Sequence, residues 1–289
     1  MELIRMSTRL VFCAAAYLAL HPMCGESAET GDSLAISEAT VEDHDVRVHT
    51  VKSPYQSGET KIRVLLPRDR EEGKPLPVLY VLPVEAGDGQ RWGDSVAEVL
   101  KLDLHNRHQL ICVFPTFSAL PWYADHPTDP ALRQESYLLE AVVPYVEKTY
   151  QAAATKEGRL LVGFSKSGYG AYTLLMRYPE LFAKAAAWDA PLMTAEPTRY
   201  GMGPIFGTQE NFEKYRVTSL LKQRAPLLRK SSRLVLTGYG GFRRQHEEAH
   251  ALMEQLKIPH EYRDGPQREH SWNSGWLAEA VELLLQPPP

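Results

Sequence analysis

The chain is poor in cysteine, with three in 289 residues: Cys13, Cys24 and Cys112. The first two fall in the N-terminal leader described below or at its end, which leaves one thiol in the body of the chain. This excludes a disulfide framework and any cysteine-based zinc or redox motif. Stability must therefore come from an ordinary hydrophobic core, which a hydrophobic content of 44% can supply.

Long apolar runs are also missing. The N-terminal run over residues 10–20 has about 11 apolar residues, whereas a membrane-spanning helix needs about 20. Arg5 and Arg9 precede this run, and small or polar residues follow it around Gly25 and Ser27. The pattern predicts a signal peptide over residues 1–27, a secreted or periplasmic protein, and no stable membrane insertion after signal removal. An uncleaved anchor or a misassigned start codon is the alternative.

Blocks of one charge are absent as well. The net charge is −4, and no five basic residues occur in a row. This argues against nucleic acid or an anionic membrane as the main partner. A neutral or weakly charged small molecule fits the composition better.

From about residue 46 the chain alternates between strand-like and helix-like segments. Residues 46–51 and 61–66 alternate in polarity, as antiparallel edge strands do, whereas residues 78–82 and 110–114 are continuously apolar, as central buried strands are. Helices are expected over 94–104 and 134–150, with a kink at Pro144. Further strands are expected over 183–188, 233–237 and 260–263, and further helices up to 177, over 245–256 and over 276–285.

This alternation predicts an α/β fold with a mostly parallel central sheet and helices on both faces. One domain is expected over residues 46–286, after an N-terminal linker over 28–45. Residues 194–229 form the one insertion long enough to act as a partial cap or lid.

Residues 160–171 read LLVGFSKSGYGA, a buried strand that turns sharply into a helix with Ser165 at the apex. This layout is typical of a nucleophile elbow, in which a strained turn exposes a serine to a histidine and to backbone N–H donors. The usual pattern is G-x-S-x-G, but Ser167 occupies the fifth position here and the glycine is displaced to Gly168. The alternative is a glycine-rich turn in which Ser165 only caps the helix.

His270 is the candidate general base, because it lies in the loop between the last strand and the last helix, at the same end of the sheet as the elbow. A surface-loop histidine without a partner is the alternative. His246 and His250 are four residues apart on an expected helix, and we interpret them as part of a solvated face. No metal site is predicted.

The order of these features resembles the esterase family of α/β-hydrolases that includes esterase D, feruloyl esterases and the mycolyl transferases. The resemblance covers nearly the whole chain after the leader, and its specific parts are the elbow and the His270 loop. It implies Ser165 as nucleophile, His270 as base and the backbone N–H of Lys166 as one oxyanion donor, with no cofactor. The matching segments are residues 78–82, 121–125, 135–150, 160–171, 178–182, 259–262 and 270–272.

The chain departs from this family at two places. The third strand is usually followed by His-Gly, but this chain reads LPVEAG over residues 82–87, so the second oxyanion donor would be the N–H of Val84 or Glu85. The triad acid usually follows the penultimate strand, yet the expected position near Gly241 holds no carboxylate. Asp189, which follows the strand after the elbow, is the proposed replacement, and a role in capping its own turn is the alternative.

Aromatic residues lie in loops at the expected site end, and Trp122, Tyr123 and Trp272 are candidate substrate contacts. Together these features predict an exported serine esterase that works through an acyl-enzyme. Export and the family resemblance imply an ester of a carbohydrate or small alcohol as its substrate. Two alternatives stay open: a binding protein that kept the fold but lost the chemistry, and an acyltransferase that uses the same serine.

Overall fold

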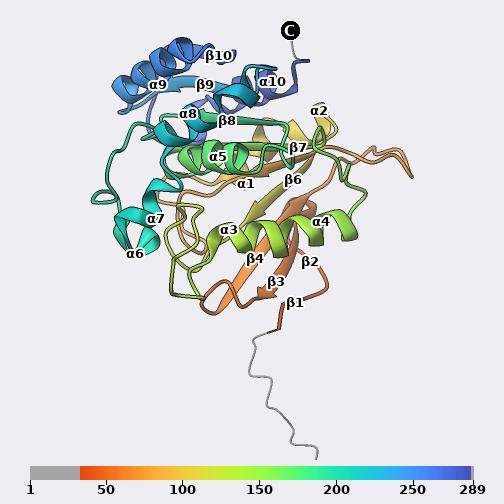
Figure 1. Cartoon of the computed structure of the whole chain (residues 1–289). Coiled ribbons are helices and arrows are strands. Elements are labelled where there is room, and N and C mark those ends of the chain that lie inside the picture. The colour runs from red at the N-terminus through yellow and green to blue at the C-terminus, as the bar shows by residue number, and fades with distance from the viewer. Residues whose placement is uncertain (1–32, 288–289) are drawn as a thin grey trace, which may run out of the picture. The chain divides into compact units, whose positions relative to one another are not determined.

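The computed structural model describes residues 33–287, and its centre is one mixed sheet of ten strands (Figure 1). The strands follow the order β1-β3-β4-β6-β5-β7-β8-β9-β10, and β2 pairs with β3 beside β1. The strands from β5 to β10 pair in parallel, whereas β4 is antiparallel to both β3 and β6. The strands are β1 (Ala35–Ile36), β2 (Thr40–Val41), β3 (Arg47–Lys52), β4 (Glu59–Leu65), β5 (Val78–Val81), β6 (Ile111–Pro115), β7 (Arg159–Phe164), β8 (Lys184–Trp188), β9 (Leu234–Tyr239) and β10 (His260–Gln267).

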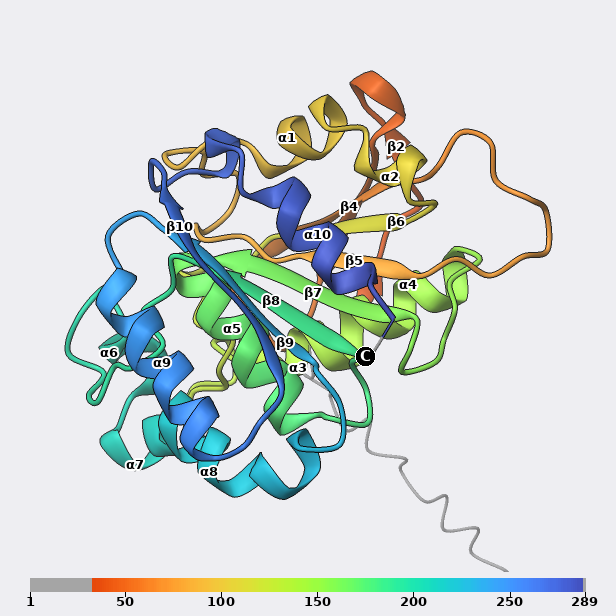
Figure 2. The ribbon, with the colours of Figure 1, turned by 90° about the horizontal axis from the view of Figure 1, so that it is seen from above.

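Helices cover both faces of this sheet, as the sequence predicts. Figure 2 shows α1, α2 and α10 on one side of the sheet and α5, α8 and α9 on the other. Every residue of β5, β6 and β7 is buried, which is why these strands are apolar except for Arg159 at the start of β7. The helices named so far are α1 (Ser95–Lys101), α2 (Leu104–Arg107), α5 (Ser165–Arg177), α8 (Val217–Leu228), α9 (Arg243–Gln255) and α10 (Leu277–Leu285).

Two expected helices are divided. The segment 94–104 breaks at Asp103, which has a φ of 53°, so α1 and α2 are separate. The segment 134–150 consists of α3 (Gln134–Ser136), a π-helical stretch η2 (Tyr137–Val142) and α4 (Val143–Thr149). Pro144 lies in the first turn of α4, where its missing N–H is tolerated, and the wider π turn precedes it.

The N-terminal expectations are met only in part. The expected signal peptide lies outside the described residues. Residues 28–45 are not all linker, because β1 and β2 come from this segment and pair antiparallel with β3. Among residues 33–287, no helix is both long and apolar enough to pass through a lipid bilayer.

The register of the parallel strands brings three chain segments to one edge of the sheet. Phe164 of β7 pairs with Trp188 of β8, and Trp188 pairs with Thr237 of β9. The residues that follow these strands therefore leave the sheet side by side. They include Ser165 and Asp189, and this edge is where open α/β sheets place their sites.

Candidate active site

Ser165 begins α5 directly after β7, and its backbone is in the left-handed region with a φ of 53°. Such a conformation is uncommon and strained for a residue with a side chain, and it occurs often at functional turns. The residue is 7% exposed. The strand-turn-helix layout predicted for the elbow is therefore present, with the serine at its apex.

Ser167 links the first turn of α5 to the end of β7. Its hydroxyl donates to the Phe164 carbonyl at 2.8 Å and accepts from the Phe164 N–H at 3.0 Å. A Cβ at Gly163 would lie 2.5–2.6 Å from atoms of Ser167, and a Cβ at Gly168 would lie 2.9 Å from the Ala190 Cβ. Glycine is usual in the fifth motif position, but here Ser167 forms two hydrogen bonds to the backbone of Phe164, which we call the Ser167 clasp. Gly163 and Gly168 allow the close contacts between the strand and the helix.

His270 and Asp189 meet at this edge, with Nδ1 of the imidazole 2.5 Å from Oδ2 of the carboxylate. An ionised carboxylate only accepts, so Nδ1 carries the proton and Nε2 is left with a free lone pair. The side chain of Asp189 is fully buried, whereas that of His270 is 23% exposed. The imidazole of His270 is therefore partly open to solvent, whereas the carboxylate that orients it is enclosed by the protein.

The glycine-rich loop after β9 holds Asp189. The N–H of Gly241 donates to both carboxylate oxygens at 2.9 and 3.0 Å, and the N–H of Phe242 donates to Oδ1 at 2.7 Å. Burial raises the pKa of Asp189, but hydrogen bonds from His270 and from the backbone N–H groups of Phe242, Gly241 and Gly240 outweigh it and hold that pKa below its usual range.

In this loop Gly240 lies against the carboxylate of Asp189, whereas a Cβ at Gly241, the expected acid position, would meet nothing within 4 Å. A Cβ at Gly240 would lie 2.6 Å from Oδ2 of Asp189. A side chain here would collide with the carboxylate that arrives from β8. A glycine at position 240 is therefore required if Asp189 is to reach this place from β8.

Aromatic rings surround the imidazole. The ring centroids of Trp92 and Phe164 each lie 5.0 Å from that of His270, and the centroid of Phe242 lies 6.0 Å away. Phe164 directly precedes Ser165, so His270 is beside the elbow. Ser165 and His270 make no direct hydrogen bond in the described part of the chain, and such bonds are often long before substrate binds.

The loop after β5 lies next to the elbow through Tyr123. The Tyr123 hydroxyl donates to the Pro83 carbonyl at 2.6 Å, one residue before Val84. Its ring covers Gly170 on α5, where a Cβ would come within 2.0 Å of the ring. Tyr123 thus fixes the distance between the start of the expected oxyanion loop and the helix that begins at Ser165.

The carboxylate of Glu85 is directed toward backbone. It accepts from the N–H of Trp92 at 3.4 Å, within its own loop. Burial lowers the pKa of the Lys166 ammonium, an effect that the Glu85 charge opposes and Arg91 adds to. The Glu85 carboxylate and the Lys166 ammonium thus attract each other without forming an ion pair.

The three aromatic candidates for substrate binding are interior side chains, because Trp122 and Tyr123 are 0% exposed and Trp272 is 2% exposed. The Trp122 indole N–H donates to the Tyr200 carbonyl at 3.3 Å. The Trp272 ring packs edge-on against Phe164 at 5.0 Å. Trp122 and Tyr123 offer a substrate no open surface, and Trp272 borders open space only at the cavity described below.

Sequence reasoning missed Gln134, which is fully buried. Its side-chain oxygen accepts from the N–H groups of Trp122 and Tyr123 at 2.8 and 2.9 Å, and its amide donates to the Leu120 carbonyl at 2.9 Å. Tyr123 has a φ of 57°, so the amide of Gln134 supports a strained turn. The sequence showed only a glutamine at the start of a predicted amphipathic helix, which is no motif.

Comparison with known proteins assigns the chain to a family. The family model described as "Putative esterase" matches residues 53–276, more than half of the chain. The chain belongs to this esterase family. Esterases from two strains of Mycobacterium tuberculosis are 29% identical to it over 135 residues, which is 45% of this chain and 29% of each esterase. The match therefore spans less than a third of the length of these relatives.

Solved structures of similar fold include a ferulic acid esterase, at 20% identity with a TM-score of 0.65. An S-formylglutathione hydrolase from Staphylococcus aureus reaches the same TM-score at 17% identity. A third, described as fluorophosphonate-binding serine hydrolase F of Staphylococcus aureus, has 18% identity and a TM-score of 0.65. Each comparison covers 86% of this chain and 98% of the other. The expected α/β-hydrolase fold is confirmed.

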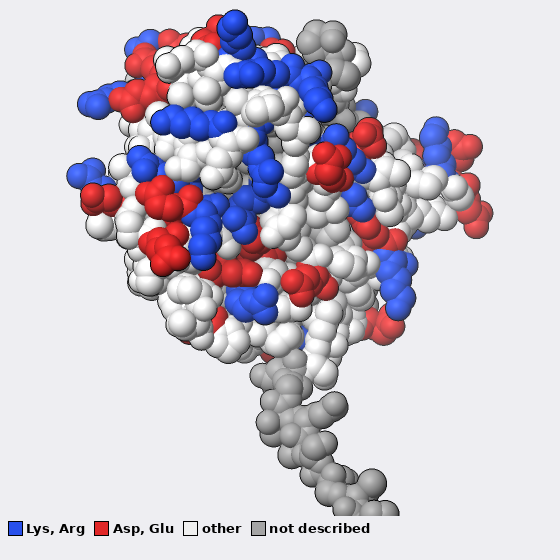
Figure 3. All heavy atoms as spheres, viewed as in Figure 1, with Lys and Arg blue, Asp and Glu red and all other residues white. Residues whose placement is uncertain are grey.

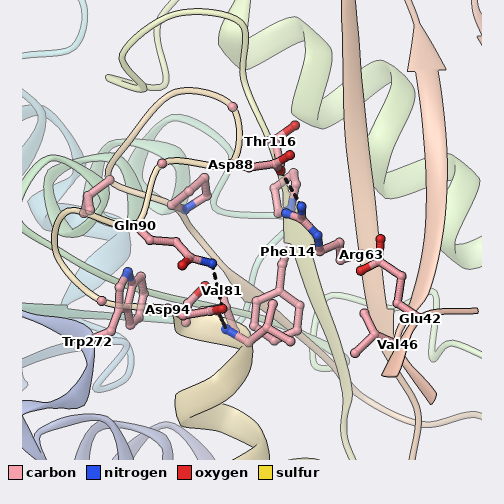
Figure 4. Close-up of a pocket in the computed structure, with 18 residues that line it drawn as sticks. Glu42, Val46, Arg63, Val81, Asp88, Gln90, Asp94, Phe114, Thr116 and Trp272 are labelled. Atoms are coloured by element: carbon pink, nitrogen blue, oxygen red, sulfur yellow. Dashed lines mark hydrogen bonds and ion pairs between the residues drawn. The ribbon is translucent and has the colours of Figure 1, made fainter. Parts of the chain in front are cut away.

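In this esterase-family chain the loop after β5 lines a cavity of about 190 Å³ (Figure 4). Pro83, Val84 and Trp272 form part of its wall, together with Asp88 and Asp94. Neither Ser165 nor His270 lines it. The cavity is therefore not formed by the two proposed reacting side chains.

The segment 194–229 contains α6 (Gly203–Phe206), α7 (Gln209–Glu213) and α8. Its residue Tyr200 packs edge-on against Phe242 at 5.7 Å, and Phe242 in turn neighbours His270. The Tyr169 hydroxyl of α5 donates to the Tyr215 carbonyl at 2.8 Å. The segment is thus tied to the elbow helix and reaches the histidine. Figure 3 shows acidic and basic side chains intermixed over the face in view.

Proposed function

We propose that this protein is a serine ester hydrolase in which Ser165 is the nucleophile, His270 the general base and Asp189 the triad acid. The 2.5 Å contact between His270 and Asp189, beside a strained serine at a strand-to-helix turn, is the observation that carries the proposal. Membership of the esterase family supports the same reaction class.

In the proposed mechanism the Nε2 lone pair of His270 takes the proton of the Ser165 hydroxyl as its oxygen attacks the ester carbonyl. The tetrahedral oxyanion accepts hydrogen bonds from the N–H of Lys166 and from the N–H of Val84 or Glu85. The imidazolium then protonates the leaving alcohol, and an acyl-enzyme forms on Ser165. Water, deprotonated by His270, releases the acid and restores the serine.

Asp189 orients the imidazole and stabilises its positive charge during this cycle. Glu85 stays compatible with an oxyanion because its carboxylate accepts from the Trp92 N–H and is attracted to the Lys166 ammonium. We further propose that the protein is exported and that its substrate is an ester of a carbohydrate or a small alcohol. The leader pattern and the similarity in fold to a ferulic acid esterase support this assignment.

Hydrolysis of a panel of aryl and acetylated-sugar esters tests the proposal. Ser165→Ala is expected to lower kcat/KM by at least about 10⁴-fold. Ser274→Ala is the matched control, because its hydroxyl donates to the Ser271 carbonyl at 3.0 Å in the His270 loop and takes no part in the mechanism. Equal turnover by wild type and Ser165→Ala would contradict the proposal.

A further inference from the structure

Away from the elbow, three side chains with metal-binding atoms meet between α9 and β10. His250 and Glu254 lie one turn apart on α9, and His260 is the first residue of β10. One ligand atom from each residue lies within 4.8 Å of the other two. His246, four residues before His250, is not part of this group, because its Nε2 accepts from the Ala190 N–H at 2.8 Å.

The imidazole of His260 is oriented as metal-binding histidines are. Its Nδ1 lies 2.8 Å from the Ile258 carbonyl, which only accepts, so Nδ1 carries the proton and Nε2 carries a lone pair. A backbone carbonyl on the far ring nitrogen is the usual support of a metal-bound histidine. The His260 side chain is 1% exposed, so water cannot easily take the place of a ligand on it.

The lone pair of His260 is directed at His250. Nε2 of His260 lies 2.8 Å from Nδ1 of His250, and the His250 ring stacks on Tyr262 with centroids 4.1 Å apart. Without an ion, His250 must donate its Nδ1 proton to His260. The stacking fixes the plane of the His250 ring. The exposed carboxylate of Glu254 lies 4.0 Å from Nδ1 of His260, so it must turn to reach the side of the ring where Nε2 lies.

We propose that His250, His260 and Glu254 form a zinc-binding site, with water as the fourth ligand. Two imidazole nitrogens and one carboxylate are donors that Zn²⁺ accepts in tetrahedral geometry. Zn–N bonds of about 2.0–2.1 Å need the two nitrogens about 3.3 Å apart, so the pair opens by about 0.5 Å when the ion enters. The His250 proton moves from Nδ1 to Nε2 of the same ring, and neither ring loses a proton.

A zinc ion here would link α9 to β10. The N–H of Phe242, just before α9, holds Asp189, and β10 leads into the loop that carries His270. The ion is expected to stabilise this part of the fold without touching the reacting atoms. The site does not depend on the proposed esterase activity, and Ser165→Ala is expected to bind zinc as the wild type does.

The test uses the untagged chain, freed of metal with a chelator, in a zinc titration against a chromophoric chelator together with thermal melting. We expect one zinc per chain and a rise in Tm of about 5 °C at 100-fold excess over Kd. His250→Asn places an amide N–H near the Nδ1 position, which keeps the hydrogen bond to His260 but removes the ligand. This variant is expected to lose at least about tenfold in zinc affinity and, at the same zinc concentration, to show at most about half of the wild-type rise in Tm.

The control is His44→Asn, which changes an exposed histidine near the N-terminal edge of the sheet and is expected to leave zinc binding unchanged. Absence of stoichiometric binding by the wild type would overturn the proposal. Equal affinity of wild type and His250→Asn would also overturn it, because the zinc would then be bound elsewhere.

Discussion

Nδ1 of His270 lies 2.5 Å from Oδ2 of Asp189, a carboxylate that leaves the sheet after β8 rather than after β9. The acid need not follow the penultimate strand, since only its reach to the imidazole matters. Backbone N–H groups of the β9 loop hold the other side of the carboxylate.

Asp189→Asn should therefore disable the histidine. The amide would favour the wrong imidazole tautomer, and we expect kcat/KM to fall by about 10³–10⁴-fold in an ester-hydrolysis assay. Asp264→Asn, which breaks an exposed pair with Arg243, serves as the control and should retain activity. Comparable activities of the two variants would show that Asp189 is not the acid.

His246 should make stability depend on pH. Burial lowers its pKa to about 4, against about 6.5 in the unfolded chain. Between these values the unfolded chain binds a proton that the folded chain does not. The free energy of unfolding should thus fall by up to about 3 kcal/mol as pH drops from about 6.5 to about 4.

His246→Gln isolates this contribution. The glutamine oxygen can still accept from the Ala190 N–H, but it does not titrate. Urea unfolding of both proteins from pH 7 to pH 4 should show a loss of stability in the wild type that is reduced in the variant. Parallel curves would rule His246 out as the source.

Tyr123→Phe should affect turnover more than binding. The variant loses the hydrogen bond to the Pro83 carbonyl and loosens the loop that is proposed to supply an oxyanion donor. We expect kcat to fall about tenfold with KM little changed. Tyr172→Phe is the matched control, since its buried hydroxyl donates to the Val235 carbonyl away from that loop. A similar loss of kcat in both variants would point to a general packing defect.

Ser167→Ala should lower stability because it removes both hydrogen bonds to Phe164 and leaves that buried N–H without its partner. We expect the free energy of unfolding to decrease by about 1–3 kcal/mol, measured by urea denaturation. An unchanged midpoint would mean that the clasp does not support the elbow.

Much of the fold follows from sequence pattern. Apolar runs marked β5 and β6 because both are buried on two faces, and the parallel register then placed Ser165 beside Asp189. The helix is divided near Pro144 because this residue has no N–H to donate, and a wider π turn precedes it. Hydrophobic periodicity predicts a helix here but does not predict the type of turn.

The candidate site was less predictable from sequence. Aromatic residues in loops indicated substrate contacts, but burial depends on what packs over them, and Tyr123 proved to be covered by α5 through Gly170. Gln134 gave no motif at all, since its role is to bond two backbone N–H groups that only the folded loop brings together.

The most direct measurement is intact-protein mass spectrometry after treatment with a fluorophosphonate, which reacts with activated serines. The account predicts one adduct per chain, mapped to Ser165 by peptide sequencing and absent from Ser165→Ala. It also predicts much slower labelling of Asp189→Asn. No adduct on the wild type, under conditions that label a control esterase, or an adduct at another residue, would contradict the account.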